Sequence, residues 1–236
     1  MQWRSFLTAV LIVVSASRLV TAADLQSLVK QLESGAVDAQ VSAAQSLGEM
    51  GPRAAAAVPA LVKALGHDDL SLRLECVMSL GNISADAAKS VPALISVLSE
   101  KDPILQHAAI DALRMFGSDA KAALPQLRKL MASKDAAMNV AAAFAIEDIS
   151  SEKADTAAAI PVLIAGLSQA PGIANEAVRG LTAVGPGATP ALLVALSGQN
   201  NQVKIRAADA LAAIGPGASG AAEALVAAVA SADDDV

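Results

Sequence analysis

Apolar residues follow two alternating patterns along this chain, and both return about every 33 residues. In the first pattern a proline is followed two residues later by leucine, at Pro59, Pro92, Pro125, Pro161 and Pro190. In the second pattern small or apolar residues precede a larger aliphatic residue, at Leu47, Leu80, Leu113, Ile146, Leu181 and Leu211. A fixed period of this kind indicates one supersecondary unit copied along the chain.

Each pattern predicts a helix. In the first, the proline suits the first turn of a helix, because its missing N–H has no partner there, and Leu61, Val62 and Leu65 continue an apolar stripe. In the second, one helical face collects the residues Leu72, Cys76, Val77, Leu80 and Ile83. No useful length of chain alternates with period two, so the sequence predicts an all-α fold without a β-sheet.

Glycine or serine stands four residues after each large aliphatic residue of the second pattern, at Gly51, Ser84, Gly117, Ser150, Gly185 and Gly215. Glycine there accepts the left-handed conformation that ends a helix. One pair of helices cannot bury its own apolar stripe, so successive pairs must stack. Alanines in the middle of the second helix, such as Ala43 and Ala109, allow the stacked helices to approach closely.

The segment 203–215 resembles the second helix of the short HEAT repeats of phycobilin lyases. The resemblance extends from about Ala23 to the C-terminus and implies a right-handed α-solenoid of stacked helical hairpins, with about six repeats and a final half repeat. In that family an aspartate and an arginine four residues later form a ladder between adjacent repeats. Here Asp69 and Arg73 alone keep this pair, so we expect stacking to rely more on apolar contact.

The first 22 residues differ in kind from the repeats. Arg4 precedes an apolar run, and Val20-Thr21-Ala22 offers the small residues at which a signal peptidase cuts. We therefore divide the chain into a signal peptide, 1–22, and a solenoid, 23–236, and we expect export to a periplasm or to the extracellular space. An uncleaved anchor is the alternative, but the apolar stretch is shorter than the roughly 20 residues that span a bilayer. Cleavage would leave no membrane span.

Charge and aromatic content exclude several classes of partner. The net charge is −6, and cleavage would remove Arg4 and Arg18 without any acid, which takes it to −8. Nucleic-acid binding depends largely on lysine and arginine, so the sequence argues against it. The cleaved chain would keep two aromatic residues, Phe116 and Phe144, too few for platforms that stack bases or sugars.

The sequence offers little catalytic chemistry. The single cysteine, Cys76, occupies a position where other repeats carry alanine, and it reads as a small core residue without a neighbouring base. The two histidines, His67 and His107, are too few and too far apart in sequence to form a metal site with it. We therefore expect no cofactor, no metal and no enzymatic activity.

The resemblance also implies that the second helices line a concave face, into which the positions two before and two after the repeat leucine point. There we predict a surface for a protein or peptide partner, made of Met78, Asp111, Met115, Phe144, Asp148 and Arg179. The methionines and Phe144 would be apolar anchors, and the charged residues would set specificity. An accessory subunit of a larger enzyme, similar to a bilin lyase, is the alternative function. The final helix, 221–230, has no second helix to cover it, so self-association through it is a further expectation.

Overall fold

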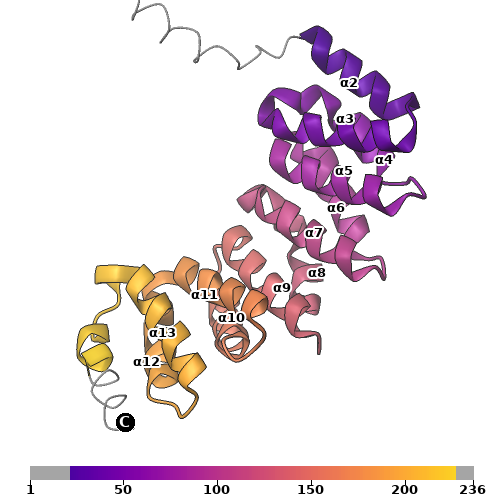
Figure 1. The fold of residues 1–236 in the computed structure, drawn as a ribbon. Coiled ribbons are helices and arrows are strands. Elements are labelled where there is room, and N and C mark those ends of the chain that lie inside the picture. The colour runs from indigo at the N-terminus through magenta and orange to yellow at the C-terminus, as the bar shows by residue number, and fades with distance from the viewer. Residues whose placement is uncertain (1–21, 227–236) are drawn as a thin grey trace, which may run out of the picture.

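The computed structural model describes residues 22–226, and within them it contains helices and no strand. These helices form six consecutive pairs, α2 (Ala22–Ser34) with α3 (Val37–Glu49), α4 (Val58–Ala64) with α5 (Leu70–Ile83), α6 (Ala87–Leu98) with α7 (Pro103–Arg114), α8 (Leu124–Met131) with α9 (Ala136–Ile149), α10 (Lys153–Gly166) with α11 (Pro171–Val184), and α12 (Thr189–Leu196) with α13 (Asn201–Ile214). Figure 1 shows the pairs stacked one after another into an arc. The all-α solenoid is therefore confirmed.

Glycine at the end of the second helix decides how the next repeat begins. Gly51, Gly117, Gly185 and Gly215 all have positive φ, between 49° and 69°, as the sequence predicts. Each of them opens a short 3₁₀ helix, of which the longest are Gly51–Ala57 and Gly117–Ala123. The shortened spacing before the sixth repeat appears as a 3₁₀ helix of four residues, Gly185–Ala188.

The prediction that each proline begins a helix is confirmed for three repeats and wrong for two. Proline lies at the first or second position of α4, α8 and α12. Pro92 and Pro161 instead lie inside α6 and α10. The repeats before these helices end in Ser84 and Ser150 and have no 3₁₀ segment, so the helix begins earlier and the proline falls beyond its first turn.

The second helices line the inner side of the arc. They contact their neighbours along the whole stack, whereas neighbouring first helices contact each other less extensively. Helices on the inner side of a curved stack must lie closer together than those on the outer side. The stack also turns visibly between α9 and α11 (Figure 1), near residues 151–156, in the repeat where Pro161 follows Pro125 by 36 residues (161 − 125) instead of 33.

The apolar core consists of two clusters that meet at α9. The first contains Ile146 and Ile149 together with the large aliphatic residues of the earlier repeats. The second contains Val140 and Phe144 together with the core of the later repeats. Leu113 and Cys76 are fully buried in the first cluster, as their positions in the repeat predict. Helix α9 is therefore the element on which both halves of the stack pack.

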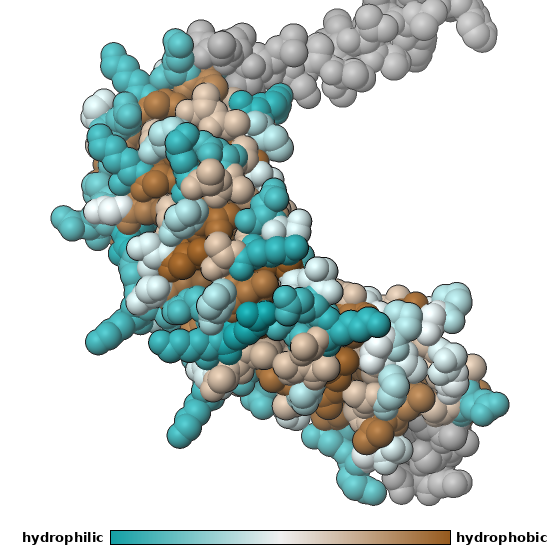
Figure 2. Space-filling view, turned by 180° about the vertical axis from the view of Figure 1, so that it is seen from behind, coloured by the Kyte–Doolittle hydropathy of each residue, from teal (hydrophilic) through white to brown (hydrophobic). Residues whose placement is uncertain are grey.

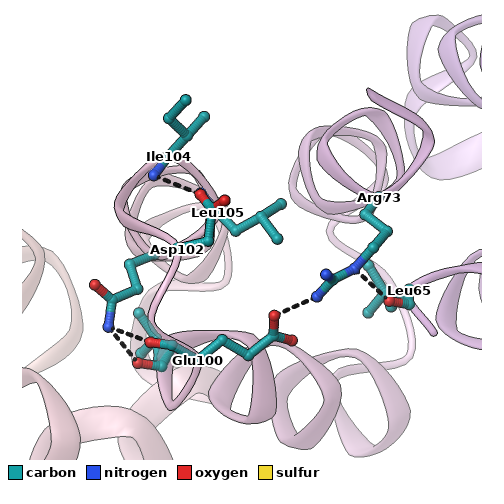
Figure 3. A network of polar contacts seen from close by, with 8 residues as sticks. Leu65, Arg73, Glu100, Asp102, Ile104 and Leu105 are labelled. Carbon is teal, nitrogen blue, oxygen red and sulfur yellow. Dashed lines mark hydrogen bonds and ion pairs between the residues drawn. The ribbon is translucent and has the colours of Figure 1, made fainter. Parts of the chain in front are cut away.

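The ladder between adjacent repeats that Asp69 and Arg73 predict forms through Arg73 alone. The Asp69 carboxylate accepts a hydrogen bond from the backbone N–H of Leu72 at 2.8 Å and so caps the start of α5. The Arg73 guanidinium donates to the carbonyl of Leu65 at 2.8 Å, at the end of α4, and forms an ion pair with Glu100 of the next repeat (Figure 3). Arg73 thus still links adjacent repeats, but through a different acid.

The position of Arg73 has the same capping role in other repeats. Gln40 donates to the carbonyl of Leu32 at 2.8 Å, and Gln106 donates to the carbonyls of Leu98 and Glu100 at 3.0 and 2.7 Å. Figure 3 also shows the Asp102 carboxylate accepting from the N–H of Ile104 at the start of α7, and the N–H of Leu105 donates to the same carboxylate at 3.0 Å. A helix end leaves carbonyls without intrahelical partners, so these side chains satisfy groups that would otherwise be unpaired.

In the fifth repeat, a side chain of the next repeat caps the carbonyls at the end of the first helix. The fifth repeat itself carries Ala174 at the capping position, and the guanidinium of Arg206 from the sixth repeat donates instead to the carbonyls of Leu167 and Gln169. On the same half of the stack, Arg128 of α8 forms two hydrogen bonds of 2.8 Å with Asp155 of α10. Polar contacts therefore supplement apolar stacking where the repeat spacing changes.

Two predictions concern residues outside the described part of the chain. The signal peptide covers residues 1–22, of which only Ala22 belongs to a described helix. The final helix is described for residues 221–226 and not beyond. Within the described residues, no helix combines the length and the apolar character needed to cross a bilayer.

Candidate functional site

The predicted concave positions are exposed in every repeat except one. Met78 is 43% exposed and Met115 is 61% exposed. Asp111, Asp148 and Arg179 are also exposed, each on its second helix. The repeat register taken from the sequence therefore holds for these five residues.

Phe144 is the exception, and the prediction that it is an exposed anchor is wrong. Its side chain is 6% exposed and belongs to the second core cluster. The Arg114 guanidinium lies 3.5 Å from the centre of the ring, and that of Arg179 lies at 5.7 Å. Gly180 of α11 has no side chain to hold the helices apart, since a Cβ there would lie 3.4 Å from the Cβ of Phe144 on α9 and 2.8 Å from Leu163 on α10. Helix α11 therefore comes close to α9, and two arginines cover the ring.

Charged side chains from three repeats join around Phe144. Arg114 pairs with Asp148 at 2.8 Å and with Asp111 at 3.3 Å. His107 lies 3.5 Å from Asp111 and 3.7 Å from Glu176 of α11. We name this group of residues the concave clasp, and it consists of His107, Asp111, Arg114, Phe144, Asp148, Glu176 and Arg179.

The clasp spans the helix that both core clusters share. His107 belongs to α7 and Glu176 to α11, so their contact reaches across α9. Hydrogen bonds to Asp111 and then to Glu176 raise the pKa of His107 to about 10, against the opposing effect of burial. Burial raises the pKa of Asp111, but its hydrogen bond to His107 and the nearby cations lower it overall. The clasp therefore carries paired charges at neutral pH.

Sequence reasoning missed three members of the clasp. Arg114 follows the repeat residue Leu113 directly, and Glu176 is buried on α11. The sequence marks His107 only as a candidate metal ligand. The repeat period could have predicted the contact between Arg114 and Asp148. These residues are 34 positions apart, close to one repeat of about 33. The contact between His107 and Glu176 has no such signal, since it skips a repeat.

An apolar groove lies beside the clasp, between α5, α7 and the start of α9. Its volume is about 680 Å³, and its apolar lining includes Leu74, Met78, Ile104, Met115 and Met138. Ile104 is 55% exposed. Figure 2 shows one side of the molecule, where hydrophobic surface lies among hydrophilic side chains along the middle of the stack. We name this volume the methionine groove.

The metal-ligating and thiol side chains of the described residues do not gather into one site. These residues contain no cluster of three or more His, Cys, Asp or Glu side chains that could hold a metal ion. Burial raises the pKa of the Cys76 thiol to about 12, which leaves it protonated and unreactive at neutral pH. Its neighbour Glu75 adds to this shift.

The stacked helical pairs and their curved inner face define an α-solenoid. The family model for HEAT repeats matches three overlapping segments, residues 25–114, 72–147 and 91–172. These segments together cover more than half of the chain, so the protein belongs to the HEAT-repeat family. A search of curated proteins gave no match.

Solved structures of the same fold include engineered and natural proteins. An engineered protein is 27% identical, with 82% of this chain and 97% of that chain covered and a TM-score of 0.57. A designed armadillo repeat protein in complex with the peptide (KR)4 is 21% identical, with 81% and 99% covered and a TM-score of 0.57. The CpcE–CpcF complex of phycocyanin lyase from Nostoc sp. is 21% identical, with 89% and 84% covered and a TM-score of 0.57. At 21% identity these likenesses show the fold alone.

Proposed function

We propose that this protein is an exported, non-catalytic interaction scaffold that binds a protein or peptide partner on its concave helical face. The observation that carries the proposal is the methionine groove. Met78, Ile104 and Met115 are exposed apolar side chains from two adjacent repeats, and they meet in one volume. Contiguous exposed apolar surface on a soluble protein favours an interaction site.

The burial of Phe144 changes which residues we assign to binding. Met78 and Met115 remain apolar anchors, and Ile104 joins them. Asp111 and Asp148 already pair with Arg114, so a partner must compete with these contacts or leave them in place. We therefore place the anchors in the methionine groove and the specificity of binding at its edges. The same fold carries a bound peptide in the designed armadillo repeat protein, which is consistent with this use of the inner face.

Affinity capture with matched variants tests the proposal. The chain 23–236 is immobilised and exposed to extract from its native source, beside Met78→Asp and Val194→Asp. Val194 lies on α12 and is 73% exposed, so its substitution adds the same charge outside the groove. The proposal requires a partner that wild type and Val194→Asp capture and Met78→Asp does not. Equal capture by all three would refute the groove as the site, and capture of an enzyme subunit would favour the alternative accessory role.

Export has its own test. N-terminal sequencing of protein secreted by the native cell should give a chain that begins at Ala23. Such a chain lacks tryptophan and tyrosine, so it should absorb very little in the near ultraviolet. A protein recovered from the cytoplasm with residues 1–22 intact would contradict export.

A further inference from the structure

The methionine groove and the concave clasp share two side chains. His107 and Asp111 both line the groove, whereas Glu176 does not. The Nδ1 atom of His107 lies 3.5 Å from the carboxylate of Asp111, and its Nε2 atom lies 3.7 Å from the carboxylate of Glu176 on α11. The imidazole ring therefore connects the groove to a helix two repeats further on.

The contact between His107 and Glu176 also crosses one wall of the groove. The start of α9 forms this wall through Asp135, Ala137 and Met138. Helix α9 packs between α7, which carries His107, and α11, which carries Glu176. The position of the wall thus depends on how firmly α7 and α11 are held to each other.

The carboxylate of Glu176 depends on His107 for a counter-charge. Glu176 is 6% exposed, and a buried charge without a partner is strongly destabilising. Within residues 22–226, His107 is the cation that forms an ion pair with Glu176. Hydrogen bonds to Asp111 and then to Glu176 raise the pKa of His107 to about 10, so the ring is protonated at neutral pH. The contact between α7 and α11 is therefore a contact between opposite charges.

We propose that Glu176 is a positioning residue for the methionine groove, and that a partner in the groove and the contact between His107 and Glu176 stabilise each other. This inference rests on the proposed function and adds a means of regulating that site. An apolar side chain in the groove would displace water from His107 and Asp111. Ion pairs strengthen as their surroundings become less polar. Because such coupling is reciprocal, loss of the contact weakens binding by the same factor.

A peptide probe and four variants test the coupling. The peptide is selected on the wild-type chain 23–236 from a random library displayed on phage, and it is kept only if Met78→Asp abolishes its binding. Its affinity is then measured on Glu176→Gln, His107→Gln and the double variant. The control is Glu147→Gln, which removes a half-buried carboxylate of α9 that neither lines the groove nor pairs with His107. Circular dichroism checks that every variant keeps its helicity.

The double variant separates a positioning role from a general loss of packing. Glu176→Gln should weaken binding of the peptide about fivefold or more, and Glu147→Gln should bind it as wild type does. In the His107→Gln background, Glu176→Gln should have no further effect, because Glu176 acts through His107. Disturbed packing of α11 would instead weaken binding in both backgrounds.

A second measurement needs no ligand. Spin labels at Glu33→Cys on α2 and Asp209→Cys on α13 are exposed and lie on the two sides of α9, whereas the buried Cys76 stays unlabelled. Electron–electron resonance should give a wider distribution of label distances in Glu176→Gln than in the wild-type background. An unchanged distribution would show that the contact does not hold the two halves, and it would overturn the inference.

The remaining outcomes separate this inference from the proposed function. Equal affinity of wild type and Glu176→Gln for the peptide would overturn the coupling and leave the groove as a binding site. The same result follows if Glu176→Gln weakens binding equally with and without His107. The absence of any peptide that depends on Met78 would overturn both proposals.

Discussion

Replacement of Phe144 by alanine tests whether the concave clasp holds the two halves of the stack together. The ring is 6% exposed and packs in the second core cluster. Loss of a buried phenylalanine side chain typically costs about 3–5 kcal/mol. The Arg114 guanidinium, 3.5 Å from the ring centre, contributes about 0.5–1 kcal/mol more where it stays partly exposed. We therefore expect Phe144→Ala to lower the free energy of unfolding by at least about 3 kcal/mol.

Urea denaturation followed by far-ultraviolet circular dichroism measures this loss. Met115→Ala is the matched control, because Met115 occupies the neighbouring repeat on the same face and is 61% exposed. Its effect should stay within about 0.5 kcal/mol. Hydrogen exchange locates the damage, since each repeat depends on its neighbours. Exchange should accelerate in α9 and α11 and change little in α3.

A small effect of Phe144→Ala would refute this reasoning. If the two variants differed by less than about 0.5 kcal/mol, the ring would contribute no more than an ordinary surface residue. Phe144 would then lie on the open concave face, as the repeat pattern alone predicts. The group of charges around it would be a surface feature and not a clasp.

Three further predictions concern single side chains. Arg206→Ala should lower the free energy of unfolding by about 1–3 kcal/mol, because it leaves the carbonyls of Leu167 and Gln169 without their hydrogen-bond donor. Hydrogen exchange at the end of α10 should become faster in this variant. The control Lys204→Ala should show neither effect. His107 has a raised pKa, so its contribution to stability is complete below pH 6.5 and is lost as the pH rises to about 10. Wild-type stability should therefore fall over that range more than that of His107→Gln, and parallel pH profiles would contradict the ion pairs. Cys76, with a pKa of about 12, should resist iodoacetamide at neutral pH in the native protein and react in urea, whereas rapid native labelling would contradict its burial.

The clasp gives the bend in the arc a physical basis. Helix α9 belongs to both core clusters, and polar contacts bridge it on the inner side through His107 and Glu176. Arg128 and Asp155 connect the first helices α8 and α10 of the fourth and fifth repeats. The hydrogen bond from Arg128 lowers the pKa of Asp155, so this contact persists at neutral pH. Both contacts fall where the repeat spacing departs from 33 residues.

The sequence by itself determined the features that depend on neighbours within one repeat. The positive φ of Gly51 and Gly117, the burial of Leu113 and Cys76, and the exposure of Met78 and Met115 all follow from the repeat period. These features are local, because the position of a residue on a helix decides which way its side chain points. The same reasoning predicted helices that start at Pro92 and Pro161, and there the missing glycine in the preceding turn changed the outcome.

Only the tertiary structure decided what happens between repeats. The repeat pattern places Phe144 at a position that points to solvent in the other repeats. It is buried because Gly180 lets α11 come close to α9. The long side chains of Arg114 and Arg179 then cover the ring. Arg73 pairs with Glu100 in the next repeat, whereas Asp69 caps the start of its own helix. His107 meets Glu176 two repeats further on. Such contacts depend on how closely neighbouring helices approach and how far long side chains reach, and a repeat pattern carries neither quantity.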